Sequence, residues 1–217
     1  MTQEQFPILT ELSLVSGEDW NVSALPSEFL GGCTTRLQKL RIKGIPFPTL
    51  PTFLSSAADL VTLDLQGIPH TWYISPEAVV AGMAALTRLD VLVLEFQSST
   101  SRPNSSGTSI WAALPTHVVL PALTFFSFRG TGEYFEDLVA QVEASQVHSI
   151  MITYLKQHIF YVPQIFKVAG QDQVLEQPRS VNAFFESSGL GIHFQLRMEN
   201  DHVEVHLNLQ NVGPDSH

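Results

Sequence analysis

Several residue types that define large classes of protein are scarce in this sequence. Cys33 is the only cysteine among 217 residues, so neither an intrachain disulfide nor a multi-cysteine zinc site can form. Because disulfides belong to oxidising compartments, we expect an intracellular protein, cytoplasmic or nuclear. No run of 18 apolar residues occurs, and the first residues lack the basic and apolar regions of a signal peptide. We therefore expect no membrane partner.

Basic residues are also scarce. The chain has 11 Lys and Arg against 21 Asp and Glu, which gives a formal net charge of −10. A protein that binds nucleic acid through its phosphates needs a basic face, so we expect no nucleic-acid partner. Charged residues make up only 15% of the chain, below the usual share of about a quarter. Either uncharged polar residues dominate the surface, or a partner covers an apolar part of it.

Motifs for catalysis and cofactor binding are missing too. The chain has no G-x-S-x-G elbow, no H-E-x-x-H motif and no dinucleotide fingerprint. His193, Glu204 and His206 share the polar face of a hairpin predicted below, but zinc needs three or four converging ligands, and a solvated strand face explains them. We predict no catalytic residue, no metal ligand and no cofactor, and hence a protein that is not an enzyme.

What the chain does have is a repeated apolar pattern, L-x-x-L-x-L. Six units carry it, with first positions at Leu9, Leu37, Leu60, Leu89, Leu123 and Val147, spaced by 23 to 34 residues. The fourth and sixth positions alternate along a short strand and point inward, and one such strand needs stacked neighbours to bury its face. The period predicts an α/β fold: an irregular leucine-rich-repeat solenoid with short parallel strands and helical or irregular return segments.

Return segments between the strands carry helix signals. Residues 75–86 predict a helix, with Ser75 as its N-cap and Pro76 at its first position, followed by apolar residues that form one stripe along it. Residues 132–145 place apolar side chains, Val142 among them, at helical spacing. Shorter helical turns are expected at 23–30 and 51–58. A Ser- and Thr-rich stretch at 98–109 predicts a flexible insert.

The C-terminal part, 178–210, predicts a strand and a hairpin that cap the array, after a short helix following Pro163. With Asn200 and Asp201 as a two-residue turn, four apolar pairs face one another. These pairs are Met198–Val203, Leu196–Val205, Phe194–Leu207 and Ile192–Leu209. The same register places Arg197 opposite Glu204. We expect residues 1–217 to form a single leucine-rich-repeat domain.

The repeats, the opening "FPILTELSL" and the tract "ITYLKQHIFYVPQIFKV" resemble fungal F-box/leucine-rich-repeat proteins. The resemblance implies repeats that hold a protein substrate for ubiquitin ligation. In such proteins an N-terminal F-box binds the Skp adaptor. The chain resembles only the repeat half, because its first unit begins within ten residues of Met1. Skp binding is therefore expected only if a longer gene product supplies an F-box.

The chain departs from the family pattern in one further way. Many leucine-rich repeats place Asn or Cys three residues after the last leucine. The corresponding residues here are Gly17, Ile45, Ile68, Gln97, Thr131 and Leu155. Without an asparagine ladder, we expect an irregular array.

Residues at the third, fifth and seventh positions of each unit are expected to share the concave face and to bind the partner. The candidates are Lys39, Arg41, Lys43, Asp64, Gln66, Val91, Val93, Phe125, Arg129 and Met151. The three cations from 39 to 43 suit an acidic partner segment, or they serve only as a solvated strand face. The four apolar residues suit a protein contact, unless the 98–109 insert or a missing segment covers them.

The sequence thus predicts a protein–protein interaction scaffold that resembles the substrate-recognition repeats of an F-box ubiquitin-ligase subunit. Its partner is an unidentified protein substrate. The alternative is a structural or orphan leucine-rich-repeat fragment with no independent activity.

Overall fold

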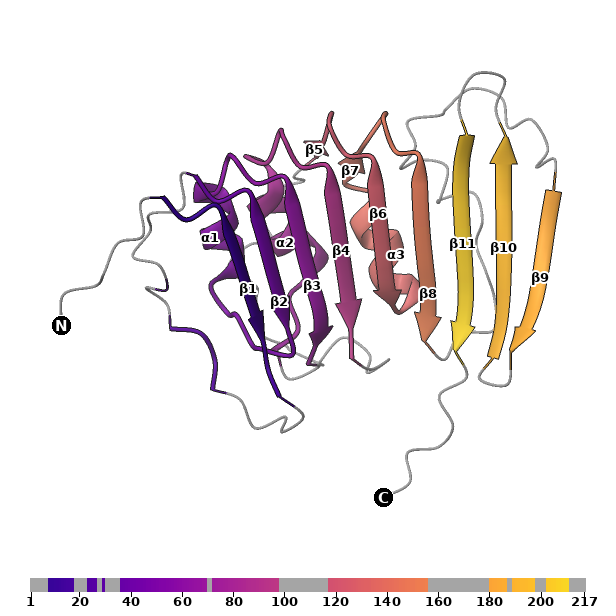
Figure 1. The fold of residues 1–217 in the computed structure, drawn as a ribbon, viewed down its shortest axis with the longest axis horizontal. Coiled ribbons are helices and arrows are strands. Elements are labelled where there is room, and N and C mark those ends of the chain that lie inside the picture. The colour runs from indigo at the N-terminus through magenta and orange to yellow at the C-terminus, as the bar shows by residue number, and fades with distance from the viewer. Residues whose placement is uncertain are drawn as a thin grey trace.

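The computed structural model describes residues 8–17, 23–26, 29, 36–69, 72–97, 117–155, 180–186, 189–197 and 202–210. These residues form a mixed α/β fold around one nine-stranded, mostly parallel sheet with the order β1-β2-β3-β4-β6-β8-β11-β10-β9 (Figure 1). Its strands are β1 (Glu11–Val15), β2 (Lys39–Lys43), β3 (Thr62–Ile68), β4 (Val91–Phe96), β6 (Phe125–Gly130), β8 (Ser149–Leu155), β9 (Ser180–Glu186), β10 (Gly189–Arg197) and β11 (His202–Gln210). A separate two-stranded pair consists of β5 (Val118–Val119) and β7 (Val142–Glu143).

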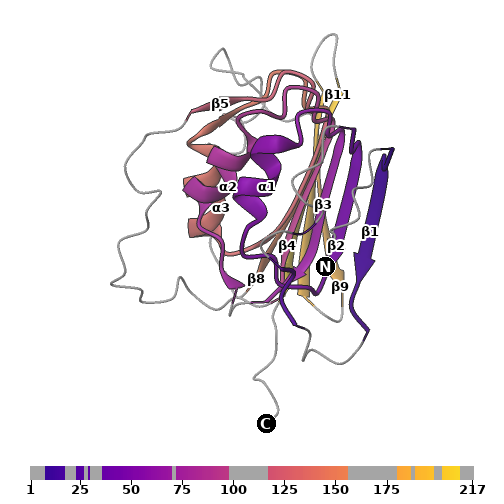
Figure 2. The ribbon, with the colours of Figure 1, turned by 90° about the vertical axis from the view of Figure 1, so that its left-hand side faces the viewer.

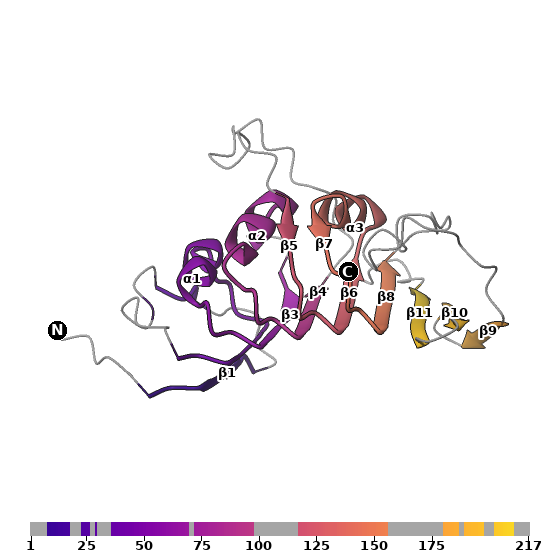
Figure 3. The same cartoon turned by 90° about the horizontal axis from the view of Figure 1, so that it is seen from above.

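Three helices cover one face of the sheet: α1 (Leu50–Ser56), α2 (Pro76–Met83) and α3 (Gly132–Val139). Figures 2 and 3 show these helices, with β5 and β7, in a layer on one side of the strands. The other face of β1 to β8 is covered by no described element, and we call it the open face. None of the helices in the described part of the chain is long and apolar enough to cross a membrane.

The six pattern units lie side by side in register, each in its own parallel strand. Their fourth positions form one row and their sixth positions another. From β2 to β8 these side chains are at most 3% exposed, and they face the helices. The inward assignment of Leu63 and Leu65, which are 0% and 3% exposed, is therefore confirmed.

A backbone ladder links the units just before the strands begin. Each carbonyl at the second position accepts the N–H groups of the second and third positions of the next unit, at 2.7–3.2 Å. The accepting carbonyls belong to Thr10, Gln38, Val61, Asp90 and Thr124. Buried backbone groups need such partners. Main-chain bonds thus satisfy them at the turn into each strand, in a chain without an asparagine ladder.

The two long predicted helices form, although both are shorter than expected: α2 ends at Met83, so Leu86 lies beyond it. Ser75 caps α2, because its Oγ accepts from the N–H of Ala78 at 3.2 Å, and Pro76 stands at the first position as predicted. The prediction for 132–145 was wrong at its end, since α3 stops at Val139 and Val142 belongs to β7. Val142 pairs with Val118, so a strand pairing replaces the last predicted turn of helix.

The C-terminal strands extend the sheet, because β11 runs parallel to β8 and pairs with it. The predicted hairpin exists, but its predicted register was wrong by two residues. Leu196 faces Val203 instead of Val205, and Arg197 faces His202 instead of Glu204. His193 and His206 are register partners. The capping role of 178–210 stays a prediction.

Residues 23–26 and 29 of the predicted turn at 23–30 are described, and the N–H of Phe29 donates to the carbonyl of Pro26 at 3.0 Å, as in a single helical turn. The insert at 98–109 and the short helix after Pro163 lie outside the described residues.

Candidate functional site

The candidate site is the open face, where the third, fifth and seventh positions of the units stand in rows across the strands. All ten sequence-predicted contact residues lie on this face, because strand side chains alternate and their neighbours at the fourth and sixth positions face the helices. One row contains Glu11, Lys39, Thr62, Val91, Phe125 and Ser149, and the next contains Ser13, Arg41, Asp64, Val93, Ser127 and Met151.

The three cations of β2 differ in their surroundings. Lys39 Nζ lies 2.7 Å from Glu11 Oε1, with both side chains more than half exposed. Arg41 Nε lies 3.2 Å from Asp64 Oδ2, and the Asp64 side chain is only 16% exposed. Lys43 is exposed and forms no ion pair with a described residue. Two of the three charges are thus neutralised within the sheet, which leaves Lys43 as the cation with an open position for a partner carboxylate.

Asp64 anchors a small polar cluster next to these cations. Its Oδ2 accepts from Arg41 and also from Gln66 Nε2 at 3.3 Å, while its Oδ1 is buried with no hydrogen-bond partner among the described residues. A buried carboxylate depends on its charged partner, so the Arg41–Asp64 contact holds the cluster together. Sequence reasoning placed Arg41, Asp64 and Gln66 on one face but missed this pairing, which the shared row position of Arg41 and Asp64 predicts.

The predicted apolar strip spans three neighbouring strands. Val91 pairs with Phe125, and Val93 and Met151 stand on either side of Ser127. The side chains of β4 and β6 in the strip are half-buried, whereas Met151 is 41% exposed. Neighbouring strands lie about 4.8 Å apart, so the strip extends across roughly 10 Å of the open face. Such a strip on a surface is typical of a protein contact.

Ser127 is the buried polar residue in the middle of this strip. It is only 6% exposed although it belongs to the open face, because its short side chain stands between the larger ones of Val93 and Met151. At one end of the strip Glu95 and Arg129 are register partners and are both half-buried. A pair of oppositely charged residues, Glu95 and Arg129, therefore borders this end of the strip.

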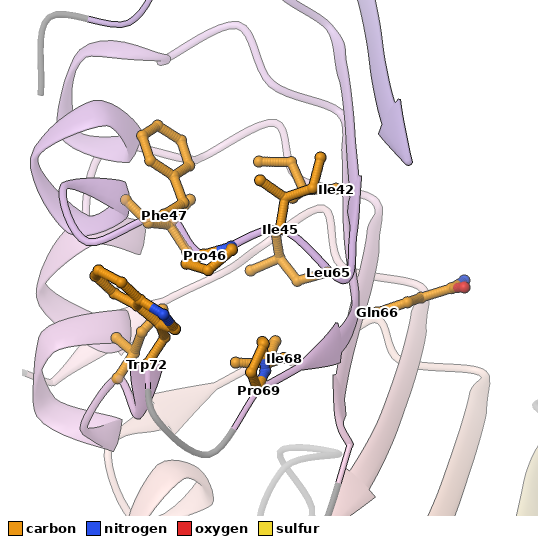
Figure 4. A pocket seen from close by; sticks show the side chains of 11 residues that line it. Ile42, Ile45, Pro46, Phe47, Leu65, Gln66, Ile68, Pro69 and Trp72 are labelled. Atoms are coloured by element: carbon orange, nitrogen blue, oxygen red, sulfur yellow. The ribbon is translucent and has the colours of Figure 1, made fainter. Parts of the chain in front are cut away.

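A small cavity lies behind the open face, between the ends of β2 and β3 and the helix layer (Figure 4). Its volume is about 20 Å³, which suits a group the size of one water. Phe47, Trp72 and other apolar side chains line it. Figure 4 shows the Gln66 side chain directed away from it, toward the open face. The cavity is far below the roughly 300 Å³ of ordinary ligand pockets, so we assign the candidate site to the open face.

Two glycines shape the strand ends beside this cavity. Gly44 and Gly67 occupy the same position in consecutive units and have φ of 66° and 60°, a conformation that other residues rarely adopt. The N–H of Gly44 donates to the carbonyl of Gln66 at 2.9 Å, and the register of β3 shifts between Leu65 and Ile68.

Within the described part of the chain, no group of three or more His, Cys, Asp or Glu could hold a metal ion. Comparison with protein families finds no family model that matches the chain, and searches of the curated proteins and of the solved structures return no match.

Proposed function

We propose that this protein is a protein–protein interaction scaffold that binds its partner on the open face. The observation that carries the proposal is the apolar strip of Val91, Val93, Phe125 and Met151 on a sheet face that no described helix covers. The helices pack against the opposite side, so the two faces of the sheet differ in role. One face builds the core, and the other presents side chains to a partner.

The charges beside the strip favour a particular kind of partner segment. Lys43 lies on β2, two strands across and two residues along from Val93 on β4, which corresponds to about 12 Å. Glu11 and Asp64 already neutralise the other two cations of β2. The partner segment is therefore an apolar one with a carboxylate about 12 Å away from its contact with Val93, rather than a long acidic tract.

The wider assignment rests on the repeat pattern and its resemblance. Six units in register, each with one strand, support an irregular leucine-rich-repeat solenoid. We propose that these repeats recognise a protein substrate in the cytoplasm or nucleus, as in F-box ubiquitin-ligase subunits. The Skp adaptor joins only where a longer gene product supplies an F-box.

Three baits test the proposal by quantitative affinity purification followed by direct binding of the purified partner. The first is the unchanged chain, and the second carries Val93→Thr with Met151→Lys. The third carries Val119→Lys, which introduces the same charge at a 52% exposed valine of β5, on the helix side. We expect the open-face variant to lose at least tenfold in affinity while melting normally, and the β5 variant to bind like the unchanged chain.

Equal affinity of all three baits would contradict the open face as the contact surface. Recovery of no direct binding partner at all would favour the alternative, a structural repeat fragment without independent activity. Recovery of the Skp adaptor by this chain alone would contradict the assignment to the repeat half.

A further inference from the structure

The first strand is an incomplete edge of the sheet. Among the described residues no strand pairs with the side of β1 that faces away from β2. Leu12 and Leu14 occupy inward positions but are only half-buried, unlike their equivalents in β2 to β8, which are at most 3% exposed. Val15 is 58% exposed. Among the described residues, β1 therefore keeps exposed apolar surface.

The backbone of this edge is ready to accept another strand. The carbonyl of Thr10 accepts from Lys39, and the N–H of Ser16 donates to the carbonyl of Lys43. Because backbone groups alternate along a strand, Leu12 and Leu14 also direct theirs toward β2. Glu11, Ser13 and Val15 therefore direct their N–H and C=O groups outward. Lysine and proline, which usually protect such edges, are absent from β1.

We infer that β1 pairs antiparallel with β1 of a second copy of this chain, about a two-fold axis at Ser13. This is the register that pairs all five residues of the strand: Ser13 with Ser13, Glu11 with Val15, and Leu12 with Leu14. The outward-directed residues become the hydrogen-bonded pairs, as antiparallel geometry requires. The half-buried leucines of the two copies meet on the helix side and cover one another.

Charge complementarity supports a second copy as the occupant. Glu11 faces Val15 of the other copy, so no like charges stand opposite one another across the new pairing. The row of side chains then runs Lys39, Glu11, Val15, Lys43, in which the last two belong to the second copy. Glu11, which already pairs with Lys39 at 2.7 Å, comes to lie about 10 Å from Lys43 of the second copy, with Val15 between them.

The two-fold axis stands perpendicular to the sheet, so both open faces look in the same direction. The dimer joins them into one continuous surface with two copies of the apolar strip. A partner with two binding segments would then gain affinity by binding both strips. A five-residue edge is small compared with the roughly 1,600 Å² of a standard interface, so we expect self-association in the micromolar range.

Sedimentation velocity over a concentration series tests the inference. Ser13→Lys places two lysines opposite each other at the axis and should raise the dimer dissociation constant at least tenfold. Val15→Pro removes an outward N–H that only the dimer uses, and it should act in the same direction. Ser145→Lys is the control: it makes the same serine-to-lysine change at an exposed position remote from β1, and this variant should dimerise like the unchanged chain.

Amide exchange supplies the second readout. The N–H groups of Glu11, Ser13 and Val15 should be protected at high protein concentration and exchange rapidly on dilution. A monomer at every concentration would overturn the inference, and so would dimers that persist in both β1 variants. Open-ended oligomers would also overturn it, because they indicate head-to-tail pairing of different edges.

Discussion

Replacement of Leu63 by alanine gives the most quantitative test of the stacked arrangement. Leu63 has no exposed surface, and its register neighbours Leu40 and Leu92 are 0% and 1% exposed. The space left by the lost side chain cannot collapse between two equally buried neighbours. We therefore expect Leu63→Ala to lower the free energy of unfolding by about 2–5 kcal/mol, which corresponds to a fall in Tm of at least about 4 °C.

Leu14→Ala is the matched control, because Leu14 lies in β1 at an equivalent inward position. Within one copy it has a neighbouring described strand on one side only and is half-buried, so at protein concentrations that keep the chain monomeric its removal should cost about 1–2 kcal/mol. Urea unfolding of both variants measures the two losses. A loss below about 1 kcal/mol for Leu63→Ala, or equal losses for the two variants, would refute a core shared between stacked units.

Two further predictions concern polar groups. Arg41→Ala should cost about 1–3 kcal/mol, because it leaves the largely buried carboxylate of Asp64 without its cation. Lys39→Ala breaks an exposed ion pair and should cost less than about 1 kcal/mol. Equal costs of the two variants in urea unfolding would argue against the buried cluster. Burial, with smaller contributions from Tyr73 and Glu77, raises the pKa of Tyr134 well above its ordinary value, and its hydroxyl donates to Ile74 at 3.0 Å. The tyrosine therefore ionises in the unfolded chain before it does in the folded one, so stability falls as the pH rises above about 10. Tyr134→Phe should be less stable than the unchanged chain by about 1 kcal/mol at pH 7 and should lose less stability above pH 10. A parallel loss of stability in both proteins would contradict this.

The repeat pattern predicts the fold because its physical basis is local. Alternation along each strand determines which side chains face inward, so the six strands, their core residues and the shared open face follow from the spacing of leucines. The N-cap at Ser75 is equally local, and the structure forms it as predicted.

Features that depend on distant contacts could not be derived in the same way. The hairpin register was wrong by two residues because a two-residue shift keeps every apolar side chain on its face, so alternation cannot distinguish the two registers. The end of α3 depends on the pairing of Val142 with Val118, which no local signal reports. Likewise, the ion pairs of Glu11 and Asp64 arise from the register between strands, and they change which cation is open to a partner.

The most direct test of the central claim is a methyl NMR titration of the chain with its purified partner. The methyl groups of Val93 and Met151 report on the open face, and those of Val119 report on the helix side. We expect the signals of Val93 and Met151 to shift or broaden as the partner is added, while those of Val119 stay unchanged. Changes at Val119 without changes at Val93 and Met151 would contradict binding on the open face.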